Sequence, residues 1–355
     1  MPQHLTQSDL TVLLNRAIKE YFEQSVTQAK QIGPSYQRLW EILRDLINSG
    51  GKRLRPHMTL YAYRAFGGKD IDKLIPIAVA QELLHFSLLI HDDIIDRDYI
   101  RYGTDNIAGS YLKEYAKHID SDDDKVHFAH SAAILGGDLI LSGAHSLIAS
   151  SELSDSEKTS AQQLLSRGIF EVAGGELLDT ESSFLPYRDG SALNIARYKT
   201  AGYSFITPLL TGAVIAGASD RQIAHLREFA IALGIAFQLV DDLLGVFGEE
   251  VTTGKSTTSD ITEGKRTFMI EKAVQAMNDE QKSRFDALFG KKDALPSEID
   301  EIKQLLISTG ARLATETEIN EYVVTARQSL RALEFNREDQ DTFEALIKKV
   351  TDRTK

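Results

Sequence analysis

Cysteine is absent from this chain of 355 residues, so neither a disulfide framework nor a thiolate metal site is possible. Positive charge is scarce as well, because 52 acidic residues against 40 lysines and arginines leave a net charge of −12. That balance argues against nucleic acid as a partner, since a phosphate backbone attracts basic surfaces. The apolar share of 42% and the charged share of 26% are ordinary for a globular protein.

Stretches rich in proline, glycine or serine are also missing, and no repeat period is evident. We therefore expect a single large domain over 1–355, with a core at about 30–280 and peripheral helices at 281–355. The first residues lack the basic-then-apolar pattern of a signal peptide, so the cytoplasm is the expected location. The uncharged run 201–218 approaches the length of a membrane span, but its glycines and Pro208 favour a buried helix, and we expect no transmembrane segment.

Helical periodicity dominates the chain, and no stretch shows the sustained alternation of a strand. Helices are predicted over 71–96, 126–150, 156–180, 221–247, 262–277 and 312–333. Ser154 and Glu157 form a capping-box pattern, whereas the acidic stretch 121–125 is interpreted as a solvated loop. The fold class predicted from these patterns is all-α.

Three aspartates, Asp92, Asp93 and Asp96, close the long apolar segment that begins at residue 71. On a helix, Asp92 and Asp96 are one turn apart and share a face. Two carboxylates at this spacing can bind Mg²⁺ ions that also hold phosphate oxygens of a substrate. Taken alone, the pattern also fits an acidic, solvated helix end.

A glycine pair precedes three cations at 50–56, in the sequence Gly-Gly-Lys-Arg-Leu-Arg-Pro. Glycine allows close backbone approach, and lysine and arginine bind phosphate. Cations at the start of a helix oppose its dipole, so this locally unfavourable choice indicates an anionic ligand. The alternative interpretation of this segment is an ordinary loop followed by a basic helix start.

A second acidic pair, Asp241 and Asp242, ends another apolar helix shortly after Gln238. Glycine-flanked lysines follow at Lys255 and Lys265. This combination suits a segment that closes over a metal-bound polyphosphate. The alternative is a surface loop between two helices.

In order and spacing, these elements resemble the polyprenyl synthetase family, the trans-isoprenyl diphosphate synthases. The matching elements are 50–56, His85, Asp92-Asp93-x-x-Asp96, 133–138, 175–179, 199–202, Gln238-x-x-Asp241-Asp242 and 264–267. The resemblance implies an all-α fold with helices around a deep central cavity, usually in a homodimer. It also implies a transferase that joins isopentenyl diphosphate head to tail to an allylic diphosphate and releases diphosphate.

The resemblance assigns a role to each matching residue, with Mg²⁺ as the cofactor. It implies metal ligation by Asp92, Asp96 and Asp241, with Asp93, Asp179, Asp242 and Asp260 as neighbouring acids. It implies that Gly51, Lys52, Arg55 and His85 hold isopentenyl diphosphate, and that Arg101, Lys199 and Lys255 hold the allylic diphosphate, with Lys265 as a further substrate-binding residue. Lys199, Thr200 and Gln238 would form the reacting centre.

The chain departs from the family pattern at three positions. Tyr102 stands where a second arginine is usual, which lowers the expected affinity for isopentenyl diphosphate unless Arg53 compensates. Glu176 replaces a usual glutamine, and Gly245 ends the second acidic motif where aspartate is frequent.

Product length in the family depends on residues just before the first acidic motif. Ser87 and Leu88 are small enough here to leave that pocket open, so we expect a product of about C20 or longer. Each helical turn adds about 5 Å of depth, which is about one isoprene unit.

Two rival functions stay open: a terpene cyclase, which would not need Lys52, Arg55 and His85, and a non-catalytic subunit of a heteromeric synthase.

Overall fold

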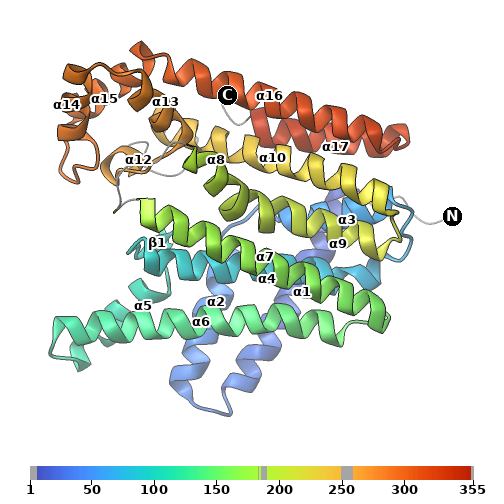
Figure 1. The fold of residues 1–355 in the computed structure, drawn as a ribbon. Coiled ribbons are helices and arrows are strands. Elements are labelled where there is room, and N and C mark those ends of the chain that lie inside the picture. The colour runs from blue at the N-terminus through green and yellow to red at the C-terminus, as the bar shows by residue number, and fades with distance from the viewer. Residues whose placement is uncertain (1–5, 183, 185–189, 249–258, 353–355) are drawn as a thin grey trace. The chain divides into compact units, whose positions relative to one another are not determined.

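The computed structural model describes residues 6–182, 184, 190–248 and 259–352 (Figure 1). The chain divides into two compact units, 1–165 with 211–217 and 166–210 with 218–355. The single domain expected from the sequence stays a prediction. The described residues are overwhelmingly helical, which confirms the predicted fold class.

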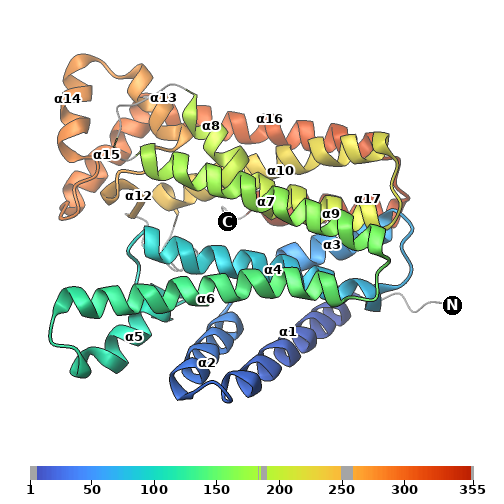
Figure 2. The same ribbon diagram turned by 60° about the horizontal axis from the view of Figure 1, so that its bottom comes forward.

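The first unit is built on two long antiparallel helices, α4 and α6, which lie side by side in both ribbon views (Figures 1 and 2). Its elements are α1 (Gln7–Ala29), α2 (Pro34–Ser49), α3 (Leu54–Ala65), α4 (Ile71–Ile95), β1 (Ile100–Arg101), β2 (Thr104–Asp105), α5 (Ile107–Tyr115), η1 (Ala116–His118), α6 (Asp122–Ser150), the start of α7 (Asp155–Ser182) and the end of α9 (Thr207–Ile215). Small residues let α4 and α6 approach closely: a Cβ at Gly137 would lie 2.2 Å from Nε2 of His91. Only glycine fits at that position without displacing the imidazole.

The second unit is centred on α10, which packs along α16 and the π-helix η2. Its elements are the rest of α7, α8 (Ser191–Ile195), η2 (Ala196–Ile206), the start of α9, α10 (Asp220–Phe247), α12 (Ser259–Thr262), α13 (Phe268–Ala276), α14 (Asp279–Leu288), α15 (Pro296–Ser308), α16 (Ala311–Ala332) and α17 (Arg337–Thr351). π-Helical turns widen the backbone and are frequent at functional sites. Here the widened helix carries Lys199 and Thr200.

Two local predictions were wrong. The acidic stretch 121–125 belongs to a helix, because Ser121 caps α6 by accepting a hydrogen bond from the Asp124 N–H and three aspartates occupy its first turn. Acidic residues there are favoured by the helix dipole. The helix predicted over 262–277 begins only at Phe268, because Gly264 has a φ of +72° and ends the preceding short helix.

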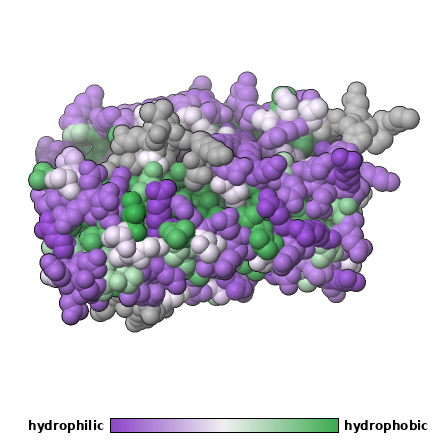
Figure 3. Space-filling model, turned by 90° about the horizontal axis from the view of Figure 1, so that it is seen from above, coloured by the Kyte–Doolittle hydropathy of each residue, from purple (hydrophilic) through white to green (hydrophobic). Residues whose placement is uncertain are grey.

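Three helices, α4, α6 and α10, are long and apolar enough to cross a membrane by length and composition. In their most apolar stretches, 72%, 44% and 61% of the residues are buried in the protein. The face seen in Figure 3 is covered mainly by hydrophilic side chains, with apolar ones between them. The uncharged run 201–218 is helical over most of its length, and Ala201, Phe205 and Leu209 are buried, as expected.

Candidate active site

The first acidic motif lies at the C-terminal end of α4, with Asp96 one turn after Asp92 as predicted. The Asp93 carboxylate is buried and accepts two hydrogen bonds from Arg101, one from Nε at 2.8 Å. Burial raises the pKa of Asp93, and the hydrogen bonds and charge of Arg101 oppose that rise. The side chain of Asp92 is partly exposed, and Arg101 is farther from it, with 3.7 Å between Nη2 and Oδ2.

A cluster of cations surrounds His85 in the first unit. Burial lowers the pKa of His85 well below its usual range, and the nearby charges of Arg55, Arg101 and Arg53 lower it further. The imidazole is therefore neutral at neutral pH and acts as a hydrogen-bonding group. The structure thus brings together Arg55, His85 and Arg101, three predicted substrate-binding residues from separate parts of the sequence. We call these three residues the cation cluster.

The loop that carries Gly51 and Lys52 joins α2 to α3 and is fixed by Arg53. Lys52 is exposed, whereas the Arg53 guanidinium is buried, 2.9 Å from Oε1 of Glu82. Arg53 also donates to the Ile47 carbonyl at 2.7 Å, and its backbone has a left-handed φ of 49°. These bonds give Arg53 a structural role and argue against it as a substitute for the arginine that the family usually has at position 102.

Tyr102 contacts the same loop from the β1–β2 turn. Tyr102 and Gly103 have φ values of 53° and 75°, as a tight two-residue hairpin turn requires. The Tyr102 ring lies against Gly50 so closely that a Cβ at Gly50 would be 2.9 Å from Cγ of the ring. The ring therefore limits the movement of the glycine pair ahead of Lys52.

The two predicted chain-length residues differ in environment. Ser87 is fully buried, and its hydroxyl donates to the Gly137 carbonyl of α6 at 2.9 Å. Leu88 is half-buried on the next position of α4. A larger side chain at Ser87 would have to displace α6, so Leu88 is the residue where bulk can be added with less disturbance.

In the second unit, Lys199 is bound by two acids of α7. Its Nζ atom lies 2.6 Å from Oδ2 of Asp179 and 3.0 Å from Oε2 of Glu176. The helices α7 and η2 touch at Gly175, where a Cβ would come within 2.2 Å of the Lys199 backbone nitrogen. Glu176, noted in the sequence only as a departure from the family pattern, is therefore a direct partner of a predicted site residue.

Thr200, Gln238 and Asp242 form a hydrogen-bonded chain. The Thr200 hydroxyl donates to Oε1 of Gln238, and Nε2 of Gln238 donates to Oδ1 of Asp242 at 2.8 Å. Burial raises the pKa of Asp242 to about 8, and the nearby charges of Asp260 and Asp241 add to this while the Gln238 hydrogen bond opposes it. Asp241 itself is exposed.

Gly245 makes room for a carboxylate from another element. A Cβ at position 245 would lie 2.0 Å from Oδ2 of Asp260 on α12. Lys265 lies 3.6 Å from the same carboxylate, measured from Nζ to Oδ1. Lys255, the other predicted lysine of this segment, lies outside the described residues.

The acids fit a hard divalent cation by their chemistry, because carboxylate oxygens are the ligands that Mg²⁺ prefers. Asp92 and Asp96 belong to the first unit and Asp241 to the second. Among the described residues, no three His, Cys, Asp or Glu side chains gather closely enough to hold a metal ion by themselves.

Comparison with known proteins agrees with this site chemistry. The sequence model of the polyprenyl synthetase family matches residues 36–306. The chain is 32% identical to a geranylgeranyl diphosphate synthase of Sulfolobus acidocaldarius over 83% of this chain and 87% of that protein. It is 31% identical to component 2 of a heptaprenyl diphosphate synthase of Geobacillus stearothermophilus over 75% of this chain and 73% of that one.

A solved structure supports the same conclusion. The geranylgeranyl pyrophosphate synthase of Corynebacterium glutamicum, complexed with isoprenyl diphosphate and magnesium, superposes with a TM-score of 0.88 at 30% identity, covering 96% of this chain and 98% of that one. The fold and the relatives define an all-α transferase of the prenyl synthase class, which elongates prenyl chains. The chain belongs to the polyprenyl synthetase family.

Proposed function

We propose that this protein condenses isopentenyl diphosphate head to tail with an allylic diphosphate, giving a trans-polyprenyl diphosphate of about C20 or longer. The cation cluster carries this proposal, because Arg55 and His85 offer a site for the diphosphate of isopentenyl diphosphate beside Arg101, the residue proposed for the allylic diphosphate. The same unit contains Asp92 and Asp96. We further propose that the protein acts as a cytoplasmic homodimer without a transmembrane segment.

The chain's own residues bind and orient the two substrates. Lys52 and Arg55 hold the diphosphate of isopentenyl diphosphate, and the neutral imidazole of His85 donates a hydrogen bond to it. The allylic diphosphate is held by cationic side chains. These are Arg101, Lys199 and Lys255, and Lys265 is a further substrate-binding residue.

The reaction breaks the carbon–oxygen bond of the allylic substrate, and the leaving diphosphate takes the electron pair. The double bond of isopentenyl diphosphate then supplies the electrons of the new carbon–carbon bond. One proton leaves the coupled product, and the released diphosphate accepts it. Thr200 and Gln238 line this centre. Water must be kept out of it, because water would capture the allylic cation.

The proposed metal ligands are Asp92, Asp96 and Asp241. Asp93 is bound by Arg101 and Asp242 by Gln238, so we assign these two acids to supporting positions. When bound, Mg²⁺ neutralises charge that grows on the leaving diphosphate.

Incubation with labelled isopentenyl diphosphate and either geranyl or farnesyl diphosphate tests the proposal, with the products identified by mass. Extension past C15 in the presence of Mg²⁺ is the expected result, and EDTA should abolish it. No extension past C15 would contradict the proposed product length, and no extension of either starter would contradict the function.

Two rivals have distinct outcomes in the same assay. Release of diphosphate from a prenyl diphosphate without isopentenyl diphosphate would identify a terpene cyclase. Failure of the purified protein to bind Mg²⁺ and diphosphate would support a non-catalytic subunit. The Geobacillus relative is named as one component of its synthase, so a heteromeric assembly is a relevant alternative to the homodimer.

Product length offers a sharper test at α4. Leu88→Phe should shorten the product by about one isoprene unit, since one helical turn measures about 5 Å. Ser87→Phe should also shorten it, but with a loss of stability, because Ser87 is packed against the Gly137 carbonyl. An unchanged product from a folded Leu88→Phe variant would contradict this model of the pocket.

A further inference from the structure

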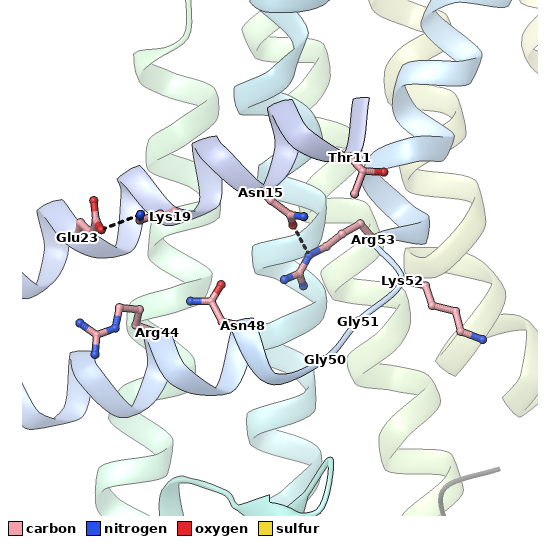
Figure 4. A pocket seen from close by; sticks show the side chains of 10 residues that line it. All are labelled: Thr11, Asn15, Lys19, Glu23, Arg44, Asn48, Gly50, Gly51, Lys52 and Arg53. Carbon is pink, nitrogen blue, oxygen red and sulfur yellow. Dashed lines mark hydrogen bonds and ion pairs between the residues drawn. The ribbon is translucent and has the colours of Figure 1, made fainter. Parts of the chain in front are cut away.

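A cavity of about 780 Å³ lies beside α1 and α2 in the first unit (Figure 4). It is lined by Thr11, Asn15, Lys19, Glu23, Arg44, Asn48, Gly50, Gly51, Lys52 and Arg53. None of Arg55, His85 and Arg101 lines it, so it differs from the cation cluster and shares with the proposed substrate site only the loop 50–53. Its volume lies within the range of about 300–1,000 Å³ typical of small-molecule sites.

The lining is positive in a chain whose net charge is −12. Four of its ten residues are cations and one is an acid. The Arg53 charge is offset by the buried Glu82 carboxylate 2.9 Å away, whereas Lys19 and Arg44 extend from facing helices. Figure 4 shows Lys52 pointing away from the other labelled side chains, so the two helices supply the main charge of the cavity.

Each of these two cations has a carboxylate partner that solvent can reach. Nζ of Lys19 lies 3.7 Å from Oε1 of Glu23, and both side chains are more than half exposed. Arg44 donates to Oδ1 of Asp45, its neighbour in sequence, from Nη2 at 2.9 Å and from Nε at 3.0 Å, and the Asp45 side chain is 62% exposed. Exposed pairs of this kind contribute little to stability, so a ligand anion can displace the carboxylates at small cost.

The remaining lining residues are hydrogen-bonding or backbone groups. Asn15 accepts a hydrogen bond from Nε of Arg53 through Oδ1 at 3.3 Å, which orients its amide nitrogen as a donor. Asn48 and Thr11 add further polar groups, and no lining residue is aliphatic or aromatic. The lining side chains end in polar or charged groups, so a hydrophilic ligand fits them better than a prenyl chain does.

We propose that this cavity binds the diphosphate group of a small hydrophilic ligand, either inorganic diphosphate or a nucleoside diphosphate. The Arg44 guanidinium can bind two phosphate oxygens as a fork, and Lys19 supplies a point charge from the facing helix. The inference concerns binding alone and holds whether or not the proposed condensation is correct.

Calorimetric titration with inorganic diphosphate and with ADP, in EDTA and in an Arg55→Gln background, tests the site. EDTA removes metal-dependent binding, and Arg55→Gln weakens the cation cluster. Adding Lys19→Gln and Arg44→Gln together should reduce affinity at least about tenfold, because each charge-assisted contact is strong. Adding Arg16→Gln should change nothing, since Arg16 lies on the same helix, pairs with Glu20 and does not line the cavity.

The outcomes of the titration distinguish a nucleotide site, a diphosphate site and the absence of a site. Tighter binding of ADP than of diphosphate would identify a nucleotide site, and equal binding would identify a diphosphate site; both support the inference. Absence of saturable binding, or equal affinity with and without the Lys19 and Arg44 substitutions, would overturn it. Far-UV circular dichroism of each variant verifies that these substitutions leave the helices intact.

Discussion

The ammonium of Lys199 lies 3.0 Å from the carboxylate of Glu176, at a position where the family usually has glutamine. Asp179 binds the same ammonium at 2.6 Å, so two negative charges face one positive charge. The group of three carries a net charge of −1 and opposes the approach of an anionic substrate. Glu176 is therefore expected to weaken the binding of a diphosphate to Lys199.

Glu176→Gln should lower the KM for the allylic diphosphate. The substitution keeps the side-chain shape and removes one charge, and we expect a change of about 1 kcal/mol, or about fivefold. Steady-state kinetics with a varied allylic starter measures it. Glu181→Gln, which changes an exposed acid five residues further along α7, is the matched control and should leave KM unaltered. An equal or higher KM for Glu176→Gln would contradict the argument.

Tyr102→Arg should lower the KM for isopentenyl diphosphate about tenfold, because a charged hydrogen bond contributes about 1.5–3 kcal/mol. The KM for the allylic substrate should not change. Tyr102→Gly separates charge from backbone effects, since glycine accepts the φ of 53° without strain but adds no cation. If Tyr102→Gly lowered the KM as much as Tyr102→Arg, the contact of the ring with Gly50, and not the missing charge, would set the affinity.

Gln81→Leu should stabilise the protein. Within the part of the chain that the structure describes, both amide atoms of Gln81 are buried without a hydrogen-bond partner, which costs about 1–3 kcal/mol. Leucine fills a similar volume without polar atoms, so the free energy of unfolding in urea should rise. Gln28→Leu on the exposed face of α1 is the control and should shift it by less than about 0.5 kcal/mol. A fall for Gln81→Leu would mean that the amide has a partner such as a bound water.

His85 should make the protein less stable in mild acid. Its pKa in the folded chain is below the ordinary value of 6.5, so between these two values the unfolded chain binds a proton that the folded chain does not. Stability therefore falls as pH drops below about 6.5, by up to about 1.4 kcal/mol per pH unit.

Urea denaturation from about pH 5 to 7.5 measures this dependence. His85→Gln should flatten the curve, and His118→Gln, which changes an exposed histidine, should not. Identical curves for wild type and His85→Gln would show that the cation cluster does not govern this titration.

Local patterns in the sequence predicted the helices and the two acidic motifs well. The end of α4 at Asp92–Asp96 follows from apolar periodicity and needs no tertiary information. Even the failure at 121–125 was local: Ser121 followed by aspartates is a capping signal that composition alone disguised as a loop.

Contacts between elements could not be predicted in the same way. Arg101 and Asp93 are eight residues apart, and Lys199 and Glu176 are 23 apart, so their pairing depends on how a hairpin folds back on α4 and how η2 packs on α7. The burial of Arg53 against Glu82 is another such contact, and it turned an apparent phosphate ligand into a structural residue.

Gly245 and Asp260 compete for one volume, since a methyl group at 245 would overlap the Asp260 carboxylate. A substitution at either position is therefore conditional on the other. Among related chains, a larger residue at the position of Gly245 should occur together with a displaced α12 or a smaller residue at the position of Asp260. The two positions are therefore expected to covary. If Gly245→Asp impairs the protein, a second substitution at residue 260 should restore its function.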